Sequence, residues 1–239
     1  MFRHRGKSRT FSHNLRLASM LSFVAGIVNV CGVMALKVLT TNITGHFAYF
    51  SEEIALQRYS FALASLLYIF AFFLGAFVSN LLIEIFVRRN ASFSYVLPMT
   101  LEIFLLSSIA LLGMAYYDTR LIACILLFAM GLQNALVTKV SNSVVRTTHL
   151  TGLFTDLGIE LSQLFFQRNN KLNFKKLMQS IGLKLSIILC FFSGCLLGGV
   201  LFGSLQLHTL LWAVAVLLIA LFYDYIRLRY FYLKRKFKH

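Results

Sequence analysis

The fold of this chain is decided by a stretch that occurs twice, first as Asn42-Ile43-Thr44-Gly45-His46-Phe47 and again as His149-Leu150-Thr151-Gly152-Leu153-Phe154. Each copy follows an apolar run that carries a glycine and an asparagine three residues apart, Gly26-x-x-Asn29 and Gly131-x-x-Asn134. A glutamate, Glu53 or Glu160, stands eight residues after each Thr-Gly pair. Polar residues that recur at matched positions about a hundred residues apart indicate a duplicated fold.

The composition identifies an α-helical integral membrane protein. Hydrophobic residues make up 59% of the 239 residues and charged residues 13%, the mean hydropathy is +0.77, and the single proline is Pro98. Soluble domains are nearer half apolar and a quarter charged. Apolar and polar residues do not alternate as they do in membrane strands, so a β-barrel is not supported.

The net charge of +15 comes largely from basic residues gathered at the two ends of the chain. Such clusters beside membrane spans set the orientation of the protein and attract anionic lipid headgroups. We therefore expect the lipid bilayer, and not nucleic acid, as their partner. The residues are Arg3, Arg5, Lys7, Arg9 and Arg16 at one end, and Arg227, Arg229, Lys234, Arg235, Lys236 and Lys238 at the other.

The apolar runs predict six transmembrane helices, since about 20 apolar residues cross a bilayer as helix. Two shorter segments, 46–57 and 150–166, follow the Thr-Gly pairs and mix apolar residues with acidic ones, which is typical of short amphipathic or re-entrant helices. The six predicted spans cover residues 15–39, 61–87, 94–116, 120–143, 180–204 and 207–228.

The placement of lysine and arginine predicts the orientation. With six spans, the basic connections 88–93 and 146–179 fall on the same side as both tails. We expect a multi-pass protein of the cytoplasmic (inner) membrane with both termini in the cytoplasm. The first apolar run contains Asn29 and lacks a small-residue cleavage site, so we expect no cleaved signal.

Each copy of the pattern belongs to a unit of three spans, and an odd number of spans predicts that the second unit is inverted in the membrane. Phe72-Phe73-x-Gly75 in the second span is echoed by Phe191-Phe192-x-Gly194 in the fifth. The predicted organisation is a basic tail (1–14), repeat 1 (15–117), repeat 2 (118–228) and a second basic tail (229–239). A duplication that merely built a stable scaffold is the alternative.

Three segments taken together carry a resemblance to a known family: Asn42-Ile43-Thr44-Gly45, Gly131-Leu132-Gln133-Asn134-Ala135 and Thr148-x-x-Thr151-Gly152. With this spacing, the chain resembles the YoaK-like family of bacterial integral membrane proteins, a domain of unknown function, from about residue 15 to residue 228. Members commonly have asparagine after the first Thr-Gly, where this chain has His46. The resemblance implies the fold more than any activity.

The polar residues at the breaks are the candidate binding site for a small solute. Glycine lets the backbone leave helical geometry, threonine can cap the next helix, and a helix that starts there directs free N–H groups at an anion or polar solute. The alternative is an interfacial turn with a satisfied cap, and for the two buried asparagines a hydrogen bond between helices. The candidates are Asn29, Asn42, Thr44, Gly45, Gln133, Asn134, Thr148, Thr151 and Gly152.

Glu102 lies about eight residues into the third predicted span. Ionisable groups at that depth are costly and mark proton or ion pathways, so Glu102 is a candidate relay, with a pair to a neighbouring helix as the alternative. Cys31, Cys124, Cys190 and Cys195 lie in apolar runs and favour neither disulfides nor a metal site. No catalytic set, metal site or cofactor motif is evident.

These features predict a small-solute transporter or permease whose site lies between two inverted repeats. A non-transporting membrane scaffold or interaction protein is the alternative, and a membrane enzyme has no residue constellation in its favour. The substrate and the coupling ion are not indicated, and a homo-oligomer is compatible with the sequence. Small residues predict close helix packing at Gly75, Ser79, Gly194, Gly198, Gly199 and Gly203.

Overall fold

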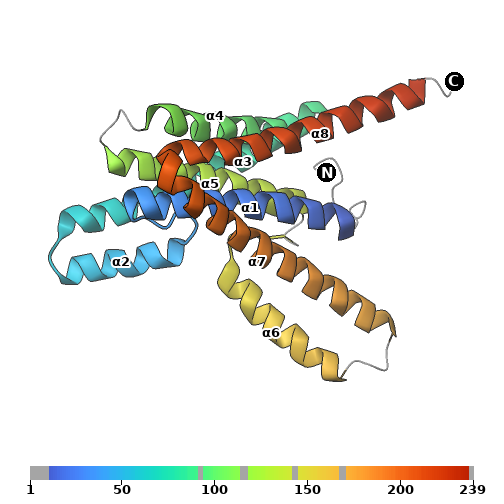
Figure 1. Cartoon of the computed structure of the whole chain (residues 1–239), viewed down its shortest axis with the longest axis horizontal. Helices are drawn as coiled ribbons and strands as arrows, with labels where there is room; N and C mark the ends of the chain where they lie inside the picture. The colour runs from blue at the N-terminus through green and yellow to red at the C-terminus, as the bar shows by residue number, and fades with distance from the viewer. Residues whose placement is uncertain (1–10, 91–93, 114–117, 142–144, 167–170, 237–239) are drawn as a thin grey trace.

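The structure is a computed structural model that describes residues 11–90, 94–113, 118–141, 145–166 and 171–236, and no strand occurs in these ranges (Figure 1). The residues 1–10 of the basic N-terminal tail lie outside them, as do the side chains of the C-terminal tail. The helices are α1 (Phe11–Leu36), α2 (Ile43–Ala55), α3 (Tyr59–Asn90), α4 (Val96–Leu112), α5 (Thr119–Ser141), α6 (Leu150–Phe166), α7 (Lys171–Leu205), the 3₁₀ turn η2 (Gln206–Thr209) and α8 (Leu210–Lys236).

The all-helical membrane fold is confirmed, but the count of six spans is not. Length and apolar composition give four candidate membrane spans in the described residues: Phe11–Leu36, Tyr59–Val87, Thr119–Ser141 and Leu172–Tyr223. The last runs through α7, η2 and most of α8, and α4 is apolar but has only 17 residues. Six spans and their inverted arrangement therefore stay predictions.

Two long helix crossings, α1 on α7 and α3 on α5, dominate the packing. In the first crossing, a Cβ atom added at Gly26 would overlap the backbone carbonyl oxygen of Phe191. In the second, a Cβ at Gly131 would overlap the carbonyl oxygen of Phe72. In lipid, helices associate through close packing of small residues and not through a hydrophobic drive, so these glycines set the depth of each crossing.

The partner helices contribute glycines to the same crossings. A Cβ at Gly194 of α7 would overlap the carbonyl oxygen of Phe23, and one at Gly75 of α3 would overlap that of Phe128. Each crossing is thus built from a glycine on both helices, and the same pattern occurs twice. The predicted small-residue packing is confirmed at these positions but not at Gly203, where a Cβ would meet nothing within 4 Å.

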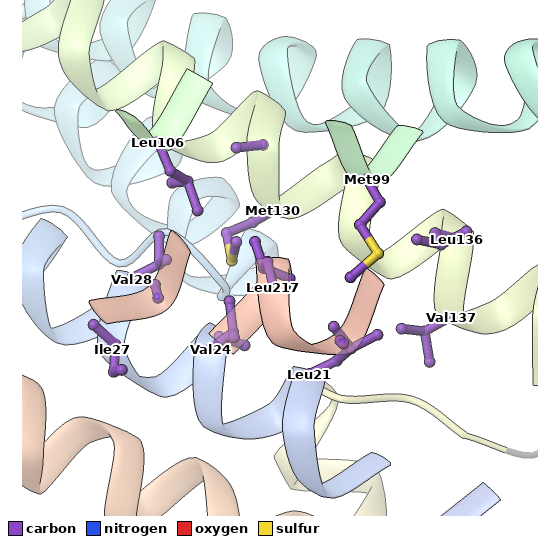
Figure 2. Packing of buried hydrophobic residues seen from close by; sticks show 14 of the residues in the cluster. Leu21, Val24, Ile27, Val28, Met99, Leu106, Met130, Leu136, Val137 and Leu217 are labelled. Carbon is purple, nitrogen blue, oxygen red and sulfur yellow. The ribbon is translucent and has the colours of Figure 1, made fainter. Parts of the chain in front are cut away.

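The larger of two hydrophobic clusters in the described residues centres on α1, α4, α5 and α8, and a smaller one joins Leu157 of α6 to Leu177 and Ile181 of α7. Figure 2 shows α1 side chains pointing toward residues of α4, α5 and α8, among them Met99, Met130 and Leu217. Leu21, Met99, Met130 and Leu217 are each fully buried. This core positions the ends of α1 and α5, after which the two breaks of the chain begin.

The short helices α2 and α6 differ in placement from the long ones. In Figure 1, both begin near the centre of the molecule and run outward, α2 toward the left and α6 toward the lower right. At 13 and 17 residues they extend about 20 and 25 Å, less than a hydrocarbon core of about 30 Å. The prediction of a short helix after each break is confirmed.

Candidate solute-binding cavity

The first break begins where the chain reverses at the end of α1. Lys37 has a φ of 59°, and its N–H bonds to the Val33 carbonyl over 3.1 Å, the hydrogen bond of an αL helix end. The Val38 N–H bonds back to the Gly32 carbonyl over 3.2 Å. The chain then returns along α1, since a Cβ on Gly32 would lie 2.5 Å from Cγ2 of Thr40. Gly32 therefore makes room for the returning chain.

A hydrogen bond fixes how far back the chain returns. The Thr41 hydroxyl donates to Oδ1 of Asn29 over 3.0 Å. Asn29 lies seven residues, or about 10 Å of helix, before the last residue of α1. The start of α2 is thereby held well inside the length of α1, as expected of a re-entrant segment.

The second break repeats this arrangement. The Thr148 hydroxyl donates to Oδ1 of Asn134 over 2.8 Å, with Thr147 at 3.4 Å from the same oxygen. Asn134 also lies seven residues before the end of its helix, α5. The backbone of Val145 is held by the Ser141 hydroxyl over 3.0 Å. The start of α6 is thus fixed beside α5 as the start of α2 is fixed beside α1.

The two Thr-Gly pairs lie in the first turns of these helices. The α2 cap is Asn42, whose Oδ1 accepts from the Gly45 N–H over 3.0 Å, so the expectation that Thr44 provides the cap was wrong. A Cβ at Gly45 would lie 3.1 Å from the Asn42 amide, and one at Gly152 would overlap the His149 ring. Both glycines leave space for the side chain that precedes the helix.

Both breaks line one cavity of about 850 Å³. Its walls combine hydroxyl and amide groups from the two breaks with one aromatic ring from α3 and one from α7. The lining residues are Asn29, Leu39, Thr41, Asn42, Ile43, Thr44, Gly45, Ala48, Phe72, Asn134, Thr138, Arg146, Thr148, His149, Leu150, Thr151 and Phe191.

The comparisons with known proteins give a family without an assigned activity. The family model described as "Protein of unknown function (DUF1275)" matches residues 17–223. The chain belongs to the DUF1275 family. It is 26% identical over 159 residues to the UPF0700 transmembrane protein YoaK of Bacillus subtilis (strain 168), covering 65% of this chain and 71% of that protein. No solved structure matches.

Most of the predicted site residues of this DUF1275 member meet at the cavity, and three do not. Gln133 is buried, and its Nε2 donates to the Leu21 carbonyl over 2.6 Å, so it ties α5 to α1. Gly152 lies beneath His149, as described above. Glu102 is fully buried in α4, away from the cavity lining, and neither carboxyl oxygen has a hydrogen-bond partner in the described residues. The expected pair between Glu102 and a neighbouring helix is therefore not found there.

Several cavity residues were missed by reasoning from the DUF1275 sequence alone. Arg146 and Thr138 stand outside the Thr-Gly pattern, although Arg146 precedes a Thr-Thr pair that also occurs at Thr40-Thr41. The repetition of this Thr-Thr pair could have indicated that the segment belongs to the site. Phe72 and Phe191 were matched across the repeats, but nothing in the sequence indicated that they line the cavity between the breaks.

The two matched glutamates of this DUF1275 chain have different surroundings. Glu160 on α6 accepts from Lys184 and from Ser180 of α7, both over 2.6 Å, and the Glu160 and Lys184 side chains are 17% and 14% exposed. Oε2 of Glu53 on α2 has no hydrogen-bond partner in the described part of the chain. The glutamate after the second break is therefore paired with a lysine of α7, and no such pair is found for Glu53 in the described residues.

Proposed function

We propose that this protein is a small-solute transporter or permease and that the shared cavity is its solute site. The observation that carries the proposal is that two breaks, far apart in sequence, line one cavity of about 850 Å³. This volume lies in the range of small-molecule binding sites, about 300–1,000 Å³. A dry, filled contact between the breaks would have favoured a scaffold instead.

The arrangement of helices supports an inverted repeat around this cavity. The glycine crossings, the Asn-Thr hydrogen bonds and the short helices each occur twice at corresponding positions. In secondary transporters built from inverted repeats, solutes bind near the middle of the membrane at broken helices, whose N-terminal ends point at polar or anionic groups. The proposal includes six spans, a bacterial inner-membrane location and cytoplasmic termini.

Flux in proteoliposomes tests the proposal. The purified full chain is reconstituted, and counterflow is measured for a broad panel of metabolites, with empty liposomes as background. We expect exchange of at least one small polar solute, and we expect Asn134→Ala and Thr151→Val to reduce it because both side chains line the cavity. Thr155→Val is the matched control, because the Thr155 hydroxyl is exposed and donates to the Thr151 carbonyl within α6.

The outcomes separate transport from a general loss of structure. Reduced exchange in Thr151→Val with an unchanged elution profile and unfolding temperature supports the proposal, whereas Asn134→Ala also removes the hydrogen bond from Thr148 and is expected to lower the stability. Absence of flux for every solute, or equal flux in wild-type, Asn134→Ala and Thr151→Val proteins, counts against it.

Within this proposal, Glu102 is a proton-binding group that couples transport. A carboxyl group without partners in an apolar interior is costly in its charged form and therefore favours the neutral acid. Solute uptake driven by a proton gradient should then be lost in Glu102→Gln, while exchange without a gradient persists. Equal gradient-driven uptake in both proteins would remove Glu102 from the mechanism.

A specific observation favours the scaffold as the second candidate. The Oδ1 atoms of Asn29 and Asn134 both accept hydrogen bonds from threonines, so these amides have a structural use without any solute. This candidate predicts that Asn29→Leu combined with Asn134→Leu lowers thermal stability and that wild-type liposomes show no flux above background.

A further inference from the structure

The described residues of the cavity lining include a basic side chain and no acidic one. None of the described residues that line it is aspartate or glutamate, and Arg146 carries a full positive charge there. The chain as a whole has 8 acidic residues against 23 lysines and arginines. Arg146 is the one residue with a permanent charge among the described residues of the lining.

Two lysines of the long helices have acidic partners. Lys139 pairs with Glu84 over 2.5 Å, and Lys184 pairs with Glu160 over 2.6 Å. Arg146 is exposed to the cavity and has no side-chain hydrogen bond or ion pair among the residues that the structure describes. A guanidinium binds carboxylates through two parallel hydrogen bonds, so a bound anion would supply the missing partner.

The remaining walls indicate what kind of anion fits. Phe72 and Phe191 contribute aromatic surface, while Thr44, Thr138 and Thr151 contribute hydroxyl groups. Sites for organic molecules combine apolar walls with a few polar groups that fix orientation. The position in the first break that matches Arg146 holds Leu39, so the lining has one arginine, which suits one negative charge.

We infer that the solute is a small organic monocarboxylate and that Arg146 is the residue that selects it. This inference rests on the transport function proposed above. The carboxylate lies against Arg146 and the hydroxyl groups of the breaks, and the carbon skeleton lies against the two phenylalanine rings. Replacing the carboxylate by a carboxamide of nearly the same shape removes the charge and should abolish binding.

Two measurements on the full chain test the inference. The first is the shift in unfolding temperature of the detergent-solubilised protein with benzoate, lactate and propionate, each compared with its own amide, and with sulfate. The second is counterflow of the same compounds in liposomes. The variants are Arg146→Gln and Arg146→Lys, and Arg16→Gln is the control, because Arg16 is also exposed but bonds to the Tyr223 hydroxyl, away from the cavity.

We expect at least one carboxylate to raise the unfolding temperature and to exchange, whereas its amide does neither. Arg146→Gln should lose both responses, Arg146→Lys should keep part of each, and Arg16→Gln should behave as wild type. If Arg146→Gln does not fold, the reduced response of Arg146→Lys to the same carboxylate serves in its place.

The two measurements distinguish the failure of this inference from the failure of the transport proposal. A carboxylate that stabilises the wild-type protein through Arg146 but does not exchange supports the ligand class and contradicts transport. Exchange of an amide or a cation that Arg146→Gln leaves unchanged supports transport and overturns the carboxylate. Equal or stronger stabilisation by sulfate, or no response to any of these compounds, also overturns it.

Discussion

Thr148 donates a 2.8 Å hydrogen bond to the side-chain oxygen of Asn134, and this bond fixes the start of α6 beside the middle of α5. Hydrogen bonds between membrane segments contribute about 0.6–2 kcal/mol. We expect Thr148→Val to lower the free energy of unfolding by about 1 kcal/mol. Equilibrium unfolding in mixed micelles measures this free energy, and the control Thr155→Val should leave it unchanged. If Thr148→Val and Asn134→Ala have additive effects in a double-mutant cycle, the bond does not contribute.

The glycine crossings give a sharper structural prediction. Gly26→Ala and Gly131→Ala each place a methyl group against a backbone carbonyl of the opposing helix, which cannot move aside as a side chain can. Overpacking of this kind costs about 1–3 kcal/mol, and we expect each substitution to lower the unfolding temperature clearly. Gly203→Ala is the matched control.

At Gly203, the added methyl meets nothing within 4 Å. Alanine is favoured over glycine in a helix by about 1 kcal/mol, so Gly203→Ala should be neutral or stabilising. Similar losses at Gly26 and Gly203 would show that the crossings are not as close as described.

Removing one partner of the ion pair between α6 and α7 should lower the free energy of unfolding more than removing both partners. Lys184→Met leaves the Glu160 carboxylate mostly buried without its cation, which should cost about 3 kcal/mol. The double variant Lys184→Met with Glu160→Gln should recover most of that loss. Hydrogen exchange of the α6 amides measures this loss of stability locally. A double variant as unstable as Lys184→Met would contradict the prediction.

Glu102 offers a test that is independent of transport. Both of its carboxyl oxygens are buried without a hydrogen-bond partner in the described residues, and Figure 2 shows neighbouring Met99 and Leu106 of α4 packed into the apolar core. An unsatisfied buried polar group costs about 1–3 kcal/mol, so Glu102→Leu should raise the stability by about that amount. A loss of stability on thermal unfolding would mean that Glu102 has a partner beyond those residues.

The sequence predicted the helical membrane fold and the two breaks because these depend on composition and on local chemistry. The segments predicted at 46–57 and 150–166 correspond to α2 (Ile43–Ala55) and α6 (Leu150–Phe166). The return of the chain along α1 was not visible, because the reversal uses Lys37 at positive φ where a glycine would have been the usual signal.

The cavity was only partly predictable for a similar reason. Asn29 and Asn134 stood out because amides are rare in apolar runs. Gln133 stood out equally, and only the packing of α5 on α1 shows that its side chain points away from the cavity. Arg146 lies in a connection rich in basic residues, where its charge had an adequate explanation in membrane orientation.

The central claim is that the two breaks share one water-accessible cavity, and cysteine labelling tests it most directly. In a background without Cys31, Cys124, Cys190 and Cys195, the reaction of Thr44→Cys with a hydrophilic maleimide is measured in liposomes, with and without Thr151→Trp. Both threonines line the cavity. We expect Thr44→Cys to react and Thr151→Trp to slow the reaction strongly, whereas Thr155→Trp should leave the rate unchanged. An unreactive Thr44→Cys, or a rate that Thr151→Trp leaves unchanged, would contradict it.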